Sequence, residues 1–199
     1  VFYADGNGFG SIQRECRSPE ALEAWDVEIK RLRRTLLNEL LTWLAATPHA
    51  RTADAALRLE TLLWGGDEML FVLPAWLGLE FARRFFALTA EWAHDGQRLA
   101  HAAGLVFAHR GAPIRHLQKL AKGLAQRAKD DGDKHRDTLA WLVLESFDTT
   151  GDDIDTHWQT SGIATEGWQA VRLDTHRLAA LANIEPLKPL LPRSALIRS

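Results

Sequence analysis

Apolar residues change their spacing several times along the chain, and each change marks a predicted element. Between residues 22 and 43 they recur every three or four positions, which predicts a long amphipathic helix. Ser18 is a suitable N-cap for this helix, and Pro19 suits its first turn. The same spacing predicts two more helices, over residues 77–92, with Gly96 ending the segment, and over residues 114–128 after Pro113.

Short apolar runs bounded by turn residues predict the strands. These runs cover residues 1–4, 57–64, 68–74, 101–109 and 138–144. The resulting order is β-α-β-β-α-β-α-β. We therefore predict an α+β fold of the ferredoxin-like type, with an antiparallel sheet and the helices packed on one face. Gly65, Gly66 and Asp67 separate two of the strands and predict a tight hairpin, because glycine adopts the positive φ angles that such turns need.

Composition narrows the possible classes of protein. The chain has 199 residues, 46% of them hydrophobic and 25% charged, as in an ordinary globular protein. Its net charge of −2 argues against a nucleic-acid binder that depends on a bulk positive field. The single cysteine, Cys16, cannot form an internal disulfide, which favours a cytoplasmic protein. No apolar run is long enough to span a bilayer, so no membrane contact is expected.

A shift in composition near residue 147 predicts two segments. Residues 1–147 hold the predicted α+β domain, and residues 148–199 read as an acidic loop followed by a proline-containing C-terminal arm that packs on the domain or leads away from it. The chain begins inside an apolar run at Val1 without an initiator methionine, so we expect it to be a piece of a longer protein.

Three carboxylates occupy the two strand ends that carry the candidate chemistry. Asp5 ends the first strand, and Asp67 with Glu68 lies at the hairpin. In a ferredoxin-like sheet these ends are neighbours, so the carboxylates are expected to converge. Hard oxygen donors suit Mg²⁺ or Mn²⁺, which also bind substrate phosphates. Gly6, Gly8 and Gly10 would let the backbone approach a triphosphate. The simpler interpretation, a hairpin turn with no catalytic role, remains open.

A family resemblance supports the catalytic interpretation. Two segments carry the resemblance: Tyr3-Ala4-Asp5-Gly6-Asn7-Gly8-Phe9-Gly10 and Trp64-Gly65-Gly66-Asp67-Glu68-Met69-Leu70-Phe71-Val72-Leu73-Pro74. They resemble the two metal motifs of polymerase and cyclase palm domains. More narrowly, they resemble the palm of the large subunit of type III CRISPR effector complexes and of related minimal CRISPR polymerases. The resemblance continues beyond these motifs and spans nearly the whole chain. Later segments similar to the family's sequences are residues 103–109, Pro113-Ile114, Ala128-Lys129 and 191–194.

The resemblance implies an enzyme that makes cyclic oligoadenylate from ATP, using two Mg²⁺ or Mn²⁺ ions and releasing pyrophosphate, in CRISPR-type antiviral defence. It also implies other domains or subunits of a larger complex as partners, with any RNA contact made through them, and a homodimer is possible.

By position, Asp5 and Asp67 would be metal ligands, and Glu68 stands where the family has an aspartate. Lys129 matches a lysine near the nucleotide phosphates, and Phe9 would pack beneath the nucleotide. The remaining nucleotide-binding positions would be Gly6, Asn7, Gly8, Gly65 and Gly66.

Three alternatives remain. A GGDEF-type diguanylate cyclase using GTP shares the palm and the hairpin glutamate, but Met69 replaces its phenylalanine and Gly10 its phosphate-binding lysine. A catalytically degenerate palm would serve as a nucleotide-binding or structural scaffold. A nucleotide-sensing domain would bind nucleotide without metal.

The pair His94-Asp95 resembles a nuclease motif, but its position before Gly96 favours a helix C-terminus.

Overall fold

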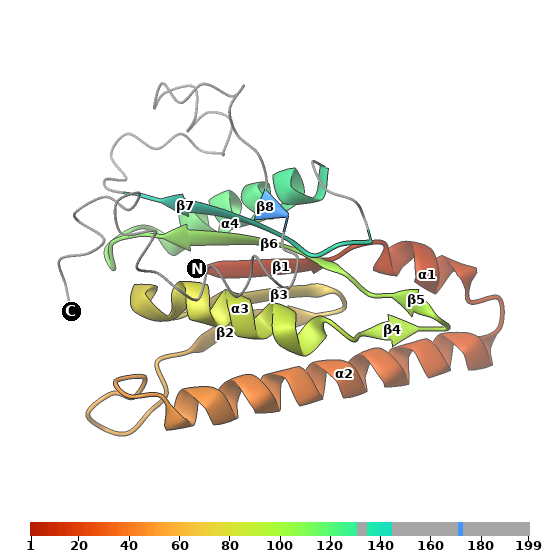
Figure 1. Cartoon of the computed structure of the whole chain (residues 1–199), viewed down its shortest axis with the longest axis horizontal. Helices are drawn as coiled ribbons and strands as arrows, with labels where there is room; N and C mark the ends of the chain where they lie inside the picture. Colours follow the sequence, from red (N-terminus) through yellow and green to blue (C-terminus); the bar gives the residue numbers. More distant parts are fainter. Residues whose placement is uncertain (131–134, 145–170, 173–199) are drawn as a thin grey trace.

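A computed structural model describes residues 1–130 and 135–144, together with the backbone of residues 171–172 (Figure 1). The fold is of the α+β class, with four α-helices around one mixed sheet in this part of the chain. The predicted order of the main elements is confirmed. The segment predicted as an acidic loop and C-terminal arm, and the resemblance at residues 191–194, lie outside the described residues apart from 171–172.

The large sheet has the strand order β2-β3-β1-β6-β7-β8. Its strands are β1 (Phe2–Gly6), β2 (Glu60–Gly65), β3 (Glu68–Val72), β6 (His101–Phe107), β7 (Thr138–Val143) and the two-residue β8 (Val171–Arg172). Strands β6 and β7 pair in parallel, whereas the other neighbours are antiparallel. The prediction of an antiparallel sheet is therefore wrong for this pair. The helix between β6 and β7 returns the chain to the same end of the sheet, which makes the two strands parallel.

The helices follow the predicted apolar periodicity. They are α1 (Phe9–Glu15), α2 (Pro19–Ala46), α3 (Gly78–Thr89) and α4 (Ile114–Asp130), with a short 3₁₀-helix, η1 (Ala75–Leu77), before α3. The hydroxyl of Ser18 accepts a hydrogen bond from the amide of Ala21 at 3.2 Å, so Ser18 caps α2 as predicted. Pro19 is the first residue of the helix, where its missing N–H costs no hydrogen bond.

Helices cover both faces of the sheet, so the prediction that they lie on one face is wrong. Alternate residues of β1 show the arrangement: Phe2 and Ala4 pack with α2 and α3, whereas Tyr3 packs with α4. Figure 1 shows α3 in front of the strands and α4 behind them. A strand that is apolar at every position is typical of burial on both sides, and the run from residue 1 to residue 4 has this character.

Helix α4 lies directly against β6, and Gly104 permits the close approach. A Cβ atom at Gly104 would stand 2.0 Å from the carbonyl oxygen of Ala121, a backbone atom of α4 that cannot move independently. This contact fixes the height of α4 above the sheet, and with it the position of every side chain that the helix presents to β1 and β3.

A short helix and a short hairpin were not predicted. Helix α1 lies between the first predicted strand and the predicted long helix, where no helix was predicted, and β4 (Ala93–His94) and β5 (Gln97–Arg98) form a separate two-stranded hairpin. Helix α3 ends at Thr89. Gly96, predicted to end that helix, instead adopts a φ of 76° in the turn of the hairpin. The prediction that His94 and Asp95 lie at a helix C-terminus is therefore wrong, because both belong to this hairpin.

Candidate functional site

The end of β1 and the β2–β3 hairpin meet as the sequence predicts. Asp5 lies directly opposite Glu68 in the antiparallel β1–β3 pair. The amide of Gly6 donates a hydrogen bond to the carbonyl oxygen of Asp67 at 3.2 Å, which extends the pairing beyond the end of β3. Gly66 adopts a φ of 54° in the turn, as the hairpin requires. The three predicted acidic residues are thus held at one place by backbone contacts.

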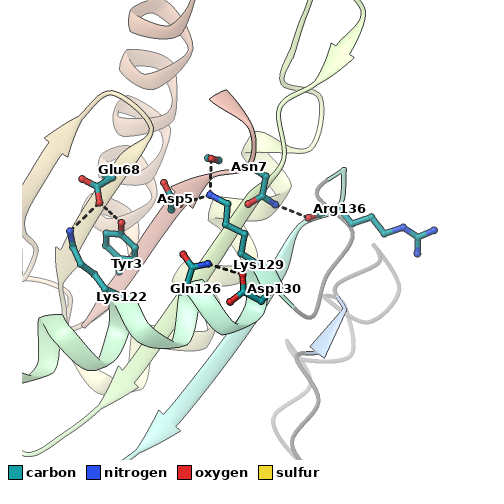
Figure 2. Close-up of polar contacts among 10 residues, drawn as sticks. Tyr3, Asp5, Asn7, Glu68, Lys122, Gln126, Lys129, Asp130 and Arg136 are labelled. Atoms are coloured by element: carbon teal, nitrogen blue, oxygen red, sulfur yellow. Dashed lines mark hydrogen bonds and ion pairs between the residues drawn. The ribbon is translucent and has the colours of Figure 1, made fainter. Parts of the chain in front are cut away.

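Lys129 of α4 pairs with Asp5. Its Nζ lies 2.7 Å from Oδ2 of Asp5 and 3.4 Å from the carbonyl oxygen of Gly6 (Figure 2). Both side chains are mostly buried, with relative exposures of 24% for Lys129 and 21% for Asp5. Lys129 thus lies beside Asp5, with a carboxylate as its partner, and its predicted contact with nucleotide phosphates stays a prediction.

Glu68 belongs to a second group on the same face of the sheet. Its Oε1 accepts hydrogen bonds from the hydroxyl of Tyr3 and, at 3.0 Å, from Nζ of Lys122. The ammonium group of Lys122 also lies 5.1 Å from the centre of the Tyr3 ring. Hydrogen bonds from Tyr3 and Lys122 lower the pKa of Glu68, whereas burial and the bond to Glu68 raise the pKa of Tyr3. Glu68 is therefore held ionised, with its carboxylate near Tyr3.

The pKa of Asp67 is shifted in the opposite direction from that of Glu68. Burial raises its pKa, and the negative charges of Asp5 and Glu68 add to the effect, while Lys129 opposes it. A cation bound beside Asp5 and Asp67 would relieve this repulsion. The donor chemistry of these two carboxylates thus fits a hard divalent ion such as Mg²⁺ or Mn²⁺. Glu68 fits only if its carboxylate leaves Tyr3 and Lys122.

No ready-made metal cluster is present in the described part of the chain. Within residues 1–130 and 135–144, no three side chains of histidine, cysteine, aspartate or glutamate are grouped closely enough to hold an ion. The reason is visible in Figure 2, where Glu68 points to Tyr3 and Lys122 while Asp5 pairs with Lys129. The backbone brings the acidic residues together, and the lysines hold two of their side chains apart.

The loop after β1 contributes a buried acceptor. Asn7 is 5% exposed, and its side-chain amide donates to the carbonyl oxygen of Arg136 at 3.3 Å. Its Oδ1 has no hydrogen-bond partner among the described residues, although it is buried. Gly8 adopts a φ of 77° just before α1, a conformation that favours glycine. The predicted nucleotide contacts of Gly6, Asn7, Gly8, Gly65 and Gly66 stay predictions.

Phe9 is buried in the core on the α2–α3 side of the sheet. It is 4% exposed, and its ring packs against Trp25 and His101. A Cβ atom at Gly6 would stand 2.6 Å from this ring, so Phe9 also requires glycine at that position. Its predicted place beneath a nucleotide stays a prediction.

Lys122 and Tyr3 are the site residues that the sequence did not single out. Lys122 precedes Lys129 by seven residues, or two helical turns, so the two side chains leave α4 on the same side. That spacing was the available indication, but a basic residue on an amphipathic helix is usually part of a solvated face. Tyr3 was predicted only as part of the first strand and of the motif over residues 3–10, with no role of its own.

Comparisons with known proteins identify no family. No protein-family model matches the sequence, and no curated protein matches it significantly. None of the helices in the described residues is both long and apolar enough to cross a membrane.

Proposed function

We propose that this chain is a palm-type nucleotidyltransferase that makes cyclic oligoadenylate, or a related cyclic nucleotide, from ATP. The observation that carries the proposal is the convergence of Asp5, Asp67 and Glu68 where β1 meets the β2–β3 hairpin. The four strands in the order β2-β3-β1-β6, with α2 and α3 on one face, support a ferredoxin-like palm. The motifs around residues 3–10 and 64–74 point to the CRISPR-associated palms.

Asp5 and Asp67 would hold a divalent ion, with Glu68 as a third donor once its carboxylate is released. When bound, the ion neutralises the triphosphate and favours loss of pyrophosphate. Lys129, already 2.7 Å from Asp5, would supply a point charge to the phosphates. The chain would thus act by positioning and charge neutralisation, with no protein nucleophile.

The proposed reaction is a displacement at the α-phosphorus of ATP. A ribose hydroxyl of a second nucleotide attacks this phosphorus and loses its proton to solvent. The bond from the α-phosphorus to the bridging oxygen of the β-phosphate breaks, and pyrophosphate leaves. Repetition and ring closure give the cyclic product. Other subunits of a larger complex are proposed as partners, and any RNA contact would be theirs.

One observation favours a second candidate, a catalytically degenerate palm that serves as a scaffold. The carboxylates of Asp5 and Glu68 already have lysine partners, Lys129 and Lys122, at 2.7 and 3.0 Å. These ion pairs neutralise two of the three carboxylates without a metal. A scaffold would keep this arrangement permanently and would not turn over nucleotide.

The first test is a thermal-shift series with ATP, GTP, CTP and UTP, each in Mn²⁺, Mg²⁺ or EDTA. With ATP and Mn²⁺ we expect a rise in melting temperature of roughly 5 °C or more, lost in EDTA and in Asp67→Asn. Asp95→Asn, at the exposed turn of the β4–β5 hairpin, is the matched control and should keep the rise. Mass spectrometry of the ATP reaction should then detect a cyclic oligoadenylate.

Other results would point elsewhere. A rise only with GTP would support a diguanylate cyclase-like enzyme, and a rise that survives EDTA would support a metal-independent sensor. Binding of ATP without any product would favour the degenerate palm. No response to any nucleotide would contradict the proposed enzyme.

A further inference from the structure

We propose that Lys122 and Lys129 act as exchangeable counter-cations of the carboxylates, and that Lys122 is a second phosphate-binding lysine. Without metal the two ammonium groups neutralise Glu68 and Asp5. Binding of a divalent ion displaces them, and both lysines then become available to a triphosphate. This inference rests on the proposed function, because it requires metal and nucleotide at this site.

Charge balance in the site is the first support. Asp5, Asp67 and Glu68 carry three negative charges when ionised, and the two lysines supply two positive ones. A divalent ion cannot enter the carboxylate group without competing with ammonium groups already at hydrogen-bond distance. Once it enters, the local charge becomes positive, which favours a polyphosphate.

The reach of the lysine side chains is the second support. Lys122 and Lys129 leave α4 on the same side, and each has a flexible four-carbon stem. Their side chains are 41% and 24% exposed, so the ammonium groups have a route toward solvent and an incoming phosphate. Neither change of partner requires α4 itself to move.

A third observation, independent of the ion pairs, points to a missing ligand at this place. Oδ1 of Asn7 is a buried acceptor without a donor among the described residues. Asn7 follows Gly6, whose carbonyl oxygen lies 3.4 Å from Nζ of Lys129. Metal-bound water or a nucleotide hydroxyl would supply the donor that this oxygen lacks.

The inference predicts effects of opposite sign on two ligands. Mn²⁺ alone is titrated into the full chain by calorimetry, with no nucleotide present. Lys129→Met and Lys122→Met should each bind Mn²⁺ about fivefold more tightly than the wild type, because a competing cation is gone. The same variants should bind ATP with Mn²⁺ about tenfold more weakly, because a phosphate partner is gone.

Matched variants separate competition from general damage. Lys119→Met removes an exposed lysine of the same helix and should change neither affinity. Lys129→Arg keeps a positive charge and should return the Mn²⁺ affinity toward that of the wild type. Circular dichroism and the melting temperature establish that each variant is folded before its affinity is compared.

A spectroscopic measurement tests the release of Glu68 directly. Tyr3 is the single tyrosine of the chain, so labelling tyrosine with ¹³C at Cζ gives one resonance. Mg²⁺ should shift this resonance in the wild type, as Glu68 leaves the hydroxyl, and should leave it unchanged in Asp67→Asn. A resonance that does not move in the wild type would overturn the proposed release.

The failures of the two proposals are distinguishable. If Mn²⁺ binds the wild type no better than it binds Asp67→Asn, both the proposed function and this inference are wrong. If Mn²⁺ binds the wild type, but Lys129→Met binds it equally or more weakly, only the inference is overturned. If Mn²⁺ binds more tightly to Lys129→Met but not to Lys122→Met, the proposed role of Lys122 is wrong.

Discussion

His101 is an ionisable residue that the fold holds without charge. Its ring is fully buried among Phe9, Phe85 and Trp92, and neither ring nitrogen has a hydrogen-bond partner among the described residues. Burial, with a smaller contribution from the charge of Arg98, lowers the pKa of His101 to about 3. The neutral ring therefore serves as a core side chain next to the candidate site.

This burial makes stability depend on pH. Histidine in the unfolded chain takes up a proton near its ordinary pKa of 6.5, whereas folded His101 does so only near 3. The unfolded state thus binds more protons in this interval, and the free energy of unfolding falls as the pH falls. Between pH 7.5 and pH 5.5 we expect His101 to account for a loss of about 1.4 kcal/mol.

Urea unfolding at several pH values measures this loss. His101→Phe should flatten the dependence on pH over that interval, whereas His109→Gln, at an exposed histidine, should leave it unchanged. An equally steep dependence in His101→Phe would contradict the assignment. Comparing slopes avoids reliance on the absolute stability of either variant.

At the scale of elements, the contact between β6 and α4 sets the geometry of the site. The backbone of α4 at Ala121 approaches Gly104 so closely that no side chain fits between them. The same helix carries both lysines that reach the carboxylates. A change that lifts α4 from the sheet would therefore alter the site even if every charged residue remained.

Gly104→Ala should destabilise the protein by about 3 kcal/mol or more, because the new methyl group would overlap the carbonyl oxygen of Ala121. Gly10→Ala is the matched control. Gly10 lies in α1, and a Cβ atom there meets nothing within 4 Å, so the substitution should be neutral or slightly stabilising. Equilibrium unfolding in urea compares the two. Similar stability of both variants would show that α4 does not lie this close to β6.

The sequence was sufficient for elements that repeat a spacing over several turns or lie beside a glycine turn. Helix α2 and the β2–β3 hairpin are examples, and the position of Asp67 followed from the hairpin. The sequence was insufficient for α1 and for the β4–β5 hairpin, because a seven-residue helix and two-residue strands are too short to show a period. The layer formed by α4 was missed because strand burial on both faces was not inferred from the continuous apolar run in β1.

The sequence was likewise sufficient for only part of the candidate site. Asp5, Asp67 and Lys129 could be placed because motif and topology determine where they lie. The partners of Glu68 could not be placed, because they depend on side-chain directions across two elements far apart in sequence. Its extra methylene relative to aspartate lengthens its reach, and in the structure the carboxylate reaches Tyr3 and Lys122.

At the scale of the whole molecule, a hydrophobic core lies on each face of the large sheet. The core beneath α4 is formed directly between helix and strands, and β1 and β6 are buried on both faces. In α2, by contrast, the apolar residues Leu22 and Val27 are 42% and 59% exposed. The β4–β5 hairpin forms a sheet of its own at the periphery.

Hydrogen exchange followed by mass spectrometry should show this difference. Amides of β1, β6 and α4 should exchange most slowly, because they open only with the whole fold. Amides of α1 and of the β4–β5 hairpin should exchange fastest among the described elements, because few buried contacts hold them. Exchange in the hairpin as slow as in α4 would contradict this ranking.

The glycine contact beneath α4 also limits how the site can respond to an ion. A helix seated backbone to backbone on a strand cannot slide by a fraction of a turn without a clash, so Lys122 and Lys129 can change partners only by rotating their own torsions. Side-chain rotations of this kind take picoseconds to nanoseconds and leave the outline of the molecule unaltered. An ion would thus reset the electrostatic field of the site while the small-angle scattering profile stayed the same.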